Sequence, residues 1–450
     1  MVATTRKPAQ SGLVKTFDSV NPATDEPVGT FPIFGEDQVN ETVARAREAA
    51  AWWSGLSFAE RKTKLLAWKS YLTRYIMRLA EVVHAETGKP TSDAQLEIML
   101  AIVHIDWAAK HAHKVLGSHK VRSGLVAFNH AATLEYHPLG VVGVIGPWNY
   151  PVFTPVGSIA YALAAGNAVV YKPSEFTPAT GGWLVSSFAE VVPEHPVLQL
   201  VTGFGETGSF LASSRVDKIA FTGSTRTAKK VMAACAENLT PMVAECGGKD
   251  AMLVAADADL DSAADAAVWG ALSNAGQTCV GVERIYVAND VYHTFIEKLA
   301  DRVSELRPGE DREASYGPMT RPGQLEVVEQ HIADAMASGG RAVVGGLGGS
   351  VFSKNKKAAM RAARSLRTGM ASVNSALTVL SVPALPFGGV GESGFGRIHG
   401  ADGLREFSRA HSITRQRMKP MTNLTTFTRT DKDMKSIMTL ITLLHGKRYK

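Results

Sequence analysis

Apolar and polar positions along the chain follow two patterns, one typical of helices and one typical of a layered α/β sheet. From residue 37 to 116 apolar side chains recur every three or four positions, and Ser57 with Glu60 forms the capping-box pattern that begins one such helix. Gly88 and Pro90 end that run. Farther along, short apolar runs alternate with helical stretches, and we read as strands VVGVIG (141–146), NAVVYK (167–172), VLQLVT (197–202), KIAF (218–221) and AMLVA (251–255). This alternation predicts an α/β fold with a parallel, doubly wound sheet.

Two segments depart from this pattern. Residues 125–138 suit a hairpin or an extended arm more than a helix. Near the C-terminus, an apolar stripe at helical spacing is flanked by Lys and Arg, an arrangement typical of a helix that lies in a membrane surface without spanning it. A tail that packs on a partner subunit, or stays unstructured, is the alternative. The stripe consists of Met434, Ile437, Met438, Ile441 and Leu444.

Charge is distributed unevenly along the 450 residues. The net charge is +6, yet from His411 onward there are nine Lys or Arg against two Asp, and the remaining residues hold 39 basic and 40 acidic side chains. A neutral body with a basic tail argues against a nucleic-acid-binding face. The 45% apolar content is enough for a large core divided into two or three domains.

Cysteine and histidine usage excludes several other classes. Three cysteines cannot make a disulfide framework, and none has the spacing of a zinc site. His111 and His113 are typical of solvated helix residues, so we expect no metal. Because we find neither a secretory signal nor an apolar stretch of membrane-spanning length, we expect a cytoplasmic protein, with membrane association only through the tail.

Cys279 is the first candidate for chemistry. A cysteine thiolate is a nucleophile that can add to a carbonyl carbon and convert it into a tetrahedral alkoxide. Cys279 stands in NAGQTCVG, a small polar stretch between a helical and a strand-like segment. The alternative is a buried, inert thiol, which is our interpretation of Cys235 in its apolar helical setting.

A base and an oxyanion donor would complete the minimal set. Glu245 ends an apolar run just before Gly247 and Gly248, where a carboxylate could activate the thiol or a water. Asn149 in GPWNYP follows a predicted buried strand, where its amide could stabilise an alkoxide. Taken alone, Glu245 is also typical of a solvated loop, and Asn149 of an ordinary turn.

Six segments in this order resemble the aldehyde dehydrogenase superfamily: GPWNYP, NAVVYKPSE, FTGST, ECGGK, GQTC and PFGGVGESGFGR. The 34 positions from Glu245 to Cys279 also match the family's spacing of base and nucleophile. The resemblance implies a Rossmann-type parallel-sheet cofactor domain, an α/β catalytic domain and a small oligomerisation arm. It implies oxidation of an aldehyde to a carboxylic acid with NAD, or with NADP as the alternative cofactor, through a thiohemiacetal and thioester on the cysteine.

The resemblance also implies a role for each matching residue. Cys279 would be the nucleophile, Glu245 the general base and Asn149 the side-chain half of the oxyanion hole, with the Cys279 backbone N–H as the other half. Phe387 would border the substrate tunnel, as would Trp148, which suggests an apolar or aromatic aldehyde. The cofactor would be held at Trp148, at Lys172 and Glu175 (ribose hydroxyls), at Gly205 (adenine), and at Gly223 and Ser224 (pyrophosphate).

The implied domains follow the same resemblance. We expect a cofactor-binding domain at 1–121 and 141–246, a catalytic domain at 247–408, an oligomerisation arm at 122–140 and 409–420, and a basic amphipathic tail at 421–450. The arm would pair subunits into a homodimer or homotetramer. GFGETG (203–208) spells the dinucleotide fingerprint, but the family places this loop near the adenine.

The resemblance breaks between Gly346 and Leu347, where several dozen family residues have no counterpart. They include the E-x-F-G-P segment, whose Glu holds the nicotinamide ribose, and strands of the catalytic sheet, so their loss would expose strand edges. We interpret the chain as a deletion variant, with a neighbour filling the gap as the alternative. Two other functions stay open. One is a Cys279-dependent esterase or acyl transferase, and the other is a silent homologue acting through its tail on a membrane or partner.

Overall fold

The computed structural model describes residues 15–123, 127, 129–309, 311, 314–337 and 349–418, together with 430–432, 435–436 and 438–439 near the C-terminus. The chain divides into two compact units. One unit comprises Met1–Leu116 and His137–Arg409, and the other comprises Gly117–Tyr136 and Ala410–Lys450. The junction at Gly346 and most of the predicted tail stripe lie outside the described residues.

Four helices fill the region in which the sequence predicts helical periodicity: α1 (Glu36–Gly55), α2 (Phe58–Arg74), α3 (Ile76–Thr87) and α4 (Thr91–Leu116). The predicted capping box is present, since Ser57 N donates to Glu60 Oε2 over 2.7 Å and Glu60 N donates to Ser57 Oγ over 3.3 Å. The run that we expected to continue to Gly88 is interrupted at Tyr75, whose φ of −109° and ψ of 20° separate α2 from α3. Gly88 then ends α3 with a φ of +68°, a conformation that glycine adopts without strain.

A six-stranded sheet has the order β14-β9-β8-β5-β6-β7. All neighbouring strands are parallel except the β14–β9 pair. The chain starts in the middle at β5, moves to β6 and β7 on one side and then to β8 and β9 on the other, so the strand order reverses between β5 and β8. In open α/β sheets ligands bind at the carboxyl ends of strands beside such a reversal. The strands are β5 (Val141–Ile145), β6 (Ala168–Lys172), β7 (Leu198–Leu200), β8 (Lys218–Gly223), β9 (Met242–Cys246) and β14 (Gly394–Phe395).

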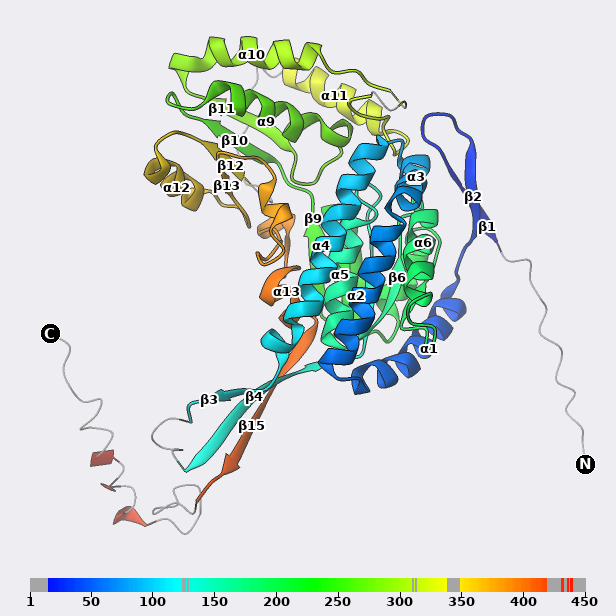
Figure 1. The fold of residues 1–450 in the computed structure, drawn as a ribbon, viewed down its shortest axis with the longest axis vertical. Coiled ribbons are helices and arrows are strands. Elements are labelled where there is room, and N and C mark those ends of the chain that lie inside the picture. The colour runs from blue at the N-terminus through cyan, green and yellow to red at the C-terminus, as the bar shows by residue number, and fades with distance from the viewer. Residues whose placement is uncertain are drawn as a thin grey trace, which may run out of the picture. The chain divides into compact units, whose positions relative to one another are not determined.

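Helices cover this sheet and connect its strands: α5 (Phe153–Ala165), α6 (Pro178–Ala189), α7 (Gly205–Ser213) and α8 (Thr225–Glu237). Every residue of α5 is buried, because the helix packs between the sheet and α4. Figure 1 shows α2, α4 and α5 lying side by side over β6. The four strands predicted between residues 141 and 221 are confirmed within this sheet.

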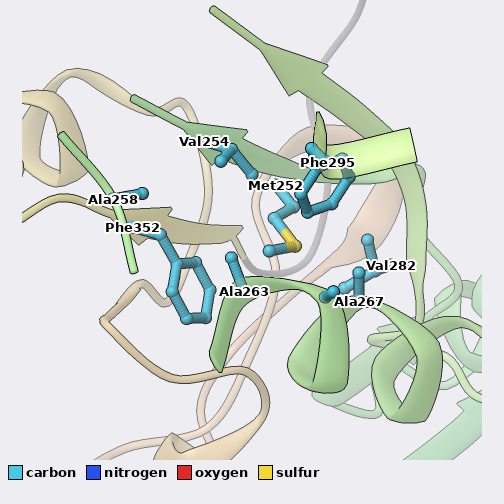
Figure 2. Packing of buried hydrophobic residues seen from close by; sticks show 9 residues of the cluster. Met252, Val254, Ala258, Ala263, Ala267, Val282, Phe295 and Phe352 are labelled. Atoms are coloured by element: carbon cyan, nitrogen blue, oxygen red, sulfur yellow. The ribbon is translucent and has the colours of Figure 1, made fainter. Parts of the chain in front are cut away.

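The fifth predicted strand, AMLVA, belongs to a different sheet of order β11-β10-β12-β13, which is parallel throughout. Figure 2 shows its core, in which Met252 and Phe352 point from the strands toward Ala263 of α9, with Phe295 of α10 packed nearby. The strands are β10 (Asp250–Val254), β11 (Val282–Val287), β12 (Gly349–Phe352) and β13 (Ser372–Val373), and the helices are α9 (Leu260–Leu272), α10 (Tyr292–Ser304), α11 (Gln324–Ala337) and α12 (Lys356–Ser365).

The segment after β13 returns to the first sheet. β14 pairs with β9, and α13 (Gly400–Glu406) packs against α4 and α5. Residues 394–395 and 400–406, which we expected in the catalytic domain, therefore lie with the six-stranded sheet and its helices.

Two smaller sheets remain. β1 (Thr16–Val20) and β2 (Pro27–Pro32) form an antiparallel pair. The second unit contains a three-stranded sheet of order β15-β4-β3, whose strands are β3 (His119–Val121), β4 (His130–Pro138) and β15 (Ser408–Gln416). The extended segment predicted at 125–138 is confirmed where it is described.

Candidate active site

A cleft of about 700 Å³ opens at the carboxyl ends of β5, β6, β8 and β9. The structure brings every site residue expected from the sequence to this one cleft. These residues, which come from segments more than 200 positions apart, are Asn149, Trp148, Lys172, Glu175, Gly205, Gly223, Ser224, Glu245, Cys279 and Phe387.

Cys279 lies between a short 3₁₀ turn (Ser273–Gly276) and β11. The turn places Asn274 and Ala275 in the left-handed region, with φ of +54° and +56°, a conformation that costs energy for residues with a side chain and is often found at functional sites. Cys279 is half-buried. Burial, and then the carboxylates of Asp250 and Glu245, raise the pKa of the Cys279 thiol to about 12. The thiol is therefore protonated at neutral pH in this state.

Asn149 is fixed beside the cysteine loop by hydrogen bonds. Its side-chain Nδ2 donates to Gln277 O over 2.8 Å. Its backbone carbonyl oxygen accepts from Lys89 Nζ over 2.7 Å and from Asn274 Nδ2 over 3.1 Å. An amide nitrogen carries two hydrogens, so one N–H of Asn149 is not used in the bond to Gln277. That N–H can donate to a developing alkoxide.

Glu245 is a buried carboxyl group on β9. Its side chain is 3% exposed, and neither oxygen has a hydrogen-bond partner among the described residues. Burial raises the pKa of Glu245 well above its usual range, although the positive charge of Arg397 opposes the shift. Glu245 is thus not the solvated loop residue that its sequence context alone also allowed. A carboxyl group with a raised pKa is a stronger base once it has lost its proton, so Glu245 in its ionised form is suited to accept a proton during a reaction.

The other end of the cleft has the features of a dinucleotide site. α8 begins at Ser224, whose Oγ caps the helix by accepting from Thr227 N over 3.2 Å, and both residues line the cleft. A helix N-terminus with exposed N–H groups favours phosphate. A Cβ on Gly205 or Gly247 would contact nothing within 4 Å, so open space for a ligand lies against both backbone segments.

Lys172 and Glu175 lie together in this part of the cleft. Burial lowers the pKa of Lys172 to about 8, while the charge of Glu175 opposes that shift. Lys172 Nζ donates to Pro173 O over 3.0 Å and has two further hydrogens for a ligand. The residues present therefore fit a dinucleotide.

GFGETG lies at α7, which follows the edge strand β7 and not the central β5, so the fingerprint does not mark the phosphate position of a standard Rossmann domain.

A second cavity meets the cleft at Thr154, Thr278, Cys279 and Phe387. The rest of its wall is largely apolar, and Cys279 stands where the two spaces join. A cofactor would thus reach the Cys279 thiol through the cleft, and a substrate would reach it through the apolar cavity. The apolar wall consists of Leu96, Leu100, Phe153, Trp269, Val280, Leu377, Leu380 and Ile398.

Several residues of the site were missed by sequence reasoning. Lys89 and Glu97 support the Asn149 turn, and Gln277 ties that turn to Thr320, whose N–H donates to Gln277 Oε1 over 2.9 Å. Gly88 and Pro90 on either side of Lys89 indicated only a helix end, and no pattern in the sequence connects it with Asn149.

Comparison with known proteins agrees with this geometry. The sequence profile of the Aldehyde dehydrogenase family matches residues 9–347 and 342–413. The chain is 35% identical to a 4,4'-diapolycopene aldehyde oxidase of a Methylomonas species, over 87% of this chain and 84% of the relative. It is 30% identical to a probable NADP⁺-dependent succinate-semialdehyde dehydrogenase of Sinorhizobium fredii, over 89% and 93% of the two chains. The NAD-dependent aldehyde dehydrogenase structure from Sinorhizobium meliloti superimposes with a TM-score of 0.86 at 29% identity, covering 91% of this chain and 93% of the other.

The chain therefore belongs to the aldehyde dehydrogenase family. It is an NAD(P)-dependent oxidoreductase that oxidises an aldehyde to the carboxylic acid. The family expected from six sequence segments is confirmed, as is the α/β fold. The matches do not favour an enzyme restricted to ester hydrolysis or a silent homologue.

The described part of the chain lacks two features. It contains no group of three or more His, Cys, Asp or Glu placed to hold a metal ion. Its helices include none with the length and apolar character needed to cross a bilayer.

Proposed function

We propose that Cys279 is the nucleophile of the oxidation, with Asn149 as oxyanion donor and Glu245 as general base. The observation that carries this proposal is the convergence of the three side chains in one cleft, at the junction with an apolar cavity. Once its proton has been removed, Cys279 adds to the aldehyde carbon to form a thiohemiacetal alkoxide. The free N–H of Asn149 and the Cys279 backbone N–H stabilise the negative oxygen.

The second half of the reaction consists of oxidation of this adduct and hydrolysis of the resulting thioester, and the hydrolysis needs a base. Bound NAD⁺ or NADP⁺ supplies the hydride acceptor that converts the thiohemiacetal into a thioester. Glu245, when deprotonated, takes a proton from a water that attacks the thioester carbon. The C–S bond then breaks, the carboxylic acid leaves, and the sulfur of Cys279 is regenerated.

The cofactor is held, on this proposal, by Lys172 and Glu175 at the ribose, by Gly223 and Ser224 at the pyrophosphate, and by Gly205 and Trp148 beside the bases. The capped N-terminus of α8 and the open space at Gly205 support these assignments. The Glu175 carboxylate would repel a 2′-phosphate, so NAD is the preferred cofactor. Phe387 lines both spaces and borders the aldehyde.

Incubation of the purified protein with a panel of aldehydes and either NAD⁺ or NADP⁺, followed by the absorbance of the reduced nicotinamide, tests the proposal. We expect aliphatic or aromatic aldehydes to be oxidised, with NAD⁺ giving the higher kcat/KM. The Glu175→Gln variant is expected to accept NADP⁺ better relative to NAD⁺. Absence of oxidation with every aldehyde and both cofactors would remove the proposed roles.

The internal deletion after Gly346 is part of the proposal. The family profile matches in two stretches that overlap at residues 342–347. The alignment with the Methylomonas oxidase extends over 447 positions while using 87% of this chain, so several dozen alignment positions have no residue in this chain. Without the segment that orients the nicotinamide ribose, hydride transfer is expected to be impaired more than reactions at Cys279 alone.

The β15-β4-β3 sheet is proposed to pair subunits into a homodimer or homotetramer. All residues of β15 but the first are exposed, and so is β3. A three-stranded sheet in which no described strand residue is fully buried is at the limit of independent stability, which favours burial against a second copy. Sedimentation velocity tests this, with Ile413→Glu on β15 expected to lower the assembled mass.

The basic tail at 421–450 is proposed to attach the protein to an anionic membrane surface. The apolar stripe and its flanking lysines support this attachment. Met438 is the member of the stripe that lies within the described residues, and it is 57% exposed. Co-sedimentation with anionic vesicles, comparing the full chain with one that ends at Thr430, tests it. Equal pelleting of the two chains, or binding that high salt does not weaken, argues against an electrostatic attachment.

A further inference from the structure

The cavity beside Cys279 contains a carboxylate whose charge is not compensated. Asp93, near the start of α4, lies in the cavity wall together with Lys89 and Glu97. The wall is otherwise formed by apolar side chains and by uncharged polar ones. These three are the charged residues among those that line the cavity in the described part of the chain.

Lys89, the one cation among the described residues of this wall, is already fully engaged. Lys89 Nζ lies 2.8 Å from Glu97 Oε2, and both side chains are almost completely shielded, at 1% and 0% exposure. Lys89 also donates to Asn149 O and stands 4.3 Å from the centre of the Tyr150 ring. Its positive charge is therefore neutralised within the wall and is not offered to a ligand.

Asp93 has no such counterpart. Its side chain makes no hydrogen bond or ion pair with the described residues, and it is only partly exposed. Burial raises the pKa of Asp93, the nearby charge of Lys89 opposes this shift, and the like charge of Glu97 adds to it. With Lys89 and Glu97 cancelling each other, the net charge of the wall is that of Asp93.

The apolar wall of the cavity also reaches solvent. Leu96 and Trp269, which both line it, are 38% and 48% exposed. An aldehyde that enters there exchanges water for hydrocarbon surface. A neutral alkyl or aryl chain gains from this exchange, whereas a carboxylate loses its hydration and finds no cation in return.

We propose that Asp93 is a specificity-determining residue that makes the enzyme select uncharged, apolar aldehydes and reject those carrying a carboxylate. The proposal rests on the proposed function and names its substrate class. Rejection has two components. The apolar wall gives an anionic chain nothing to bind, and Asp93 adds like-charge repulsion at short range in a medium of low dielectric constant.

The test compares pentanal with succinic semialdehyde, which are similar in length but differ in the terminal carboxylate. For the unmodified protein we expect kcat/KM for pentanal to be higher by a factor of roughly one hundred or more. Asp93→Asn should raise kcat/KM for succinic semialdehyde roughly tenfold and leave that for pentanal within about twofold. Glu81→Gln, a change at an exposed acid on α3 outside the cavity, is the matched control and should alter neither value.

A second comparison needs no hydride acceptor, so it remains informative if the deletion impairs oxidation. Hydrolysis of 4-nitrophenyl butanoate should exceed that of the monoanionic 4-nitrophenyl hydrogen succinate, and Asp93→Asn should narrow the difference. Equal rates for neutral and anionic substrates in the unmodified protein, or a proportional change of both in Asp93→Asn, would overturn the role of Asp93 while leaving the dehydrogenase intact. Loss of oxidation and of ester hydrolysis with every substrate would instead overturn the proposed function, and with it this inference.

Discussion

Lys89 and Glu97 form an ion pair almost wholly shielded from solvent, with 2.8 Å between Nζ and Oε2. The pair links two parts of the active site, because Glu97 Oε1 accepts from the backbone N–H groups of Val152 and Phe153 while Lys89 donates to Asn149 O. The segment 149–153, which carries the proposed oxyanion donor, is thus held at its start by Lys89, just before α4, and at its end by Glu97 of α4.

Removing one member of this pair should be costly. Lys89→Met leaves the Glu97 carboxylate buried without its cation, and we expect the free energy of unfolding to fall by about 3–5 kcal/mol. The double variant Lys89→Met/Glu97→Gln removes both charges and should recover most of this loss. Urea denaturation measures both values. Lys298→Met breaks a surface pair with Asp261 and should cost no more than about 1 kcal/mol. A Lys89 variant as stable as the Lys298 control would show that the buried pair has no structural role.

Replacement of the proposed nucleophile should abolish turnover. A serine hydroxyl is a much weaker nucleophile than a thiolate at neutral pH, so Cys279→Ser should lose both aldehyde oxidation and ester hydrolysis, by a factor of about 10³ or more. Cys235 and Cys246 are buried, and burial raises the pKa of each thiol to about 11. Alanine at either position should leave turnover largely intact. If Cys246→Ala were as damaging as Cys279→Ser, the choice of thiol would be wrong.

The sequence predicted the site to the extent that its residues lie in local motifs. Cys279, Glu245 and Asn149 each stand in a short segment that resembles the family, and the structure places all three in one cleft. Lys89 and Asp93 could not be found this way, because they lie just before α4 and in its first turn, about 190 residues before Cys279, and their spacing is that of an ordinary helix start.

The same limit applies to the fold. Apolar runs predicted the strands, but a run does not specify its partner, and β10 pairs with β11 and β12 in a sheet separate from β5 and β6. Strand pairing depends on contacts between distant residues that no local pattern encodes. The break at Tyr75 was missed for a related reason, since the apolar periodicity continues from α2 into α3 without a glycine or proline.

The raised pKa of Glu245 couples activity to pH. The carboxyl group is protonated, and inactive as a base, below this raised pKa, so hydrolysis of the thioester should accelerate as pH rises. Glu245→Gln should lower steady-state turnover by about 10²-fold or more and remove this acceleration. Stopped-flow measurement of the first turnover and the steady state separates the two halves of the reaction. A Gln variant with the original pH profile would exclude Glu245 as the base.

Stability should show the opposite dependence at the same residue. Because the folded state favours protonated Glu245, its contribution is fully present below the unfolded pKa of about 4.5 and is lost as pH rises through the folded pKa. Glu245→Gln should therefore raise the melting temperature at pH 8 more than at pH 5. Equal shifts at both pH values would contradict the buried, neutral state of this carboxyl.

His104 and His399 predict a sensitivity to acid. Their ring centroids lie 3.8 Å apart with the ring planes tilted by 37°. Burial lowers the pKa of His104 to about 4 and that of His399 well below its usual range. Both are held neutral, so their contribution to stability is present above about pH 6.5 and is lost as pH falls toward the folded pKa values. His399→Asn keeps a residue that tolerates the φ of +66° and removes one titrating ring. Its acid unfolding midpoint should move to lower pH, whereas His111→Asn on α4 should leave the midpoint unchanged.

The proposed deletion after Gly346 should impair aldehyde oxidation at Cys279 more than ester hydrolysis at the same residue. Ester hydrolysis requires Cys279, Asn149 and Glu245 but no hydride acceptor, whereas oxidation also depends on the position of the nicotinamide, where a small displacement costs orders of magnitude in rate. Relative to a family member that retains the E-x-F-G-P segment, this chain should therefore keep a larger fraction of its hydrolysis of 4-nitrophenyl acetate than of its NAD⁺-dependent oxidation. Full retention of both activities would mean that the missing contacts are dispensable or replaced within the assembly. Loss of both activities by the same large factor would indicate damage to the whole fold. Circular dichroism and a melting curve on the same samples separate these two outcomes, because only the second is accompanied by loss of cooperative unfolding.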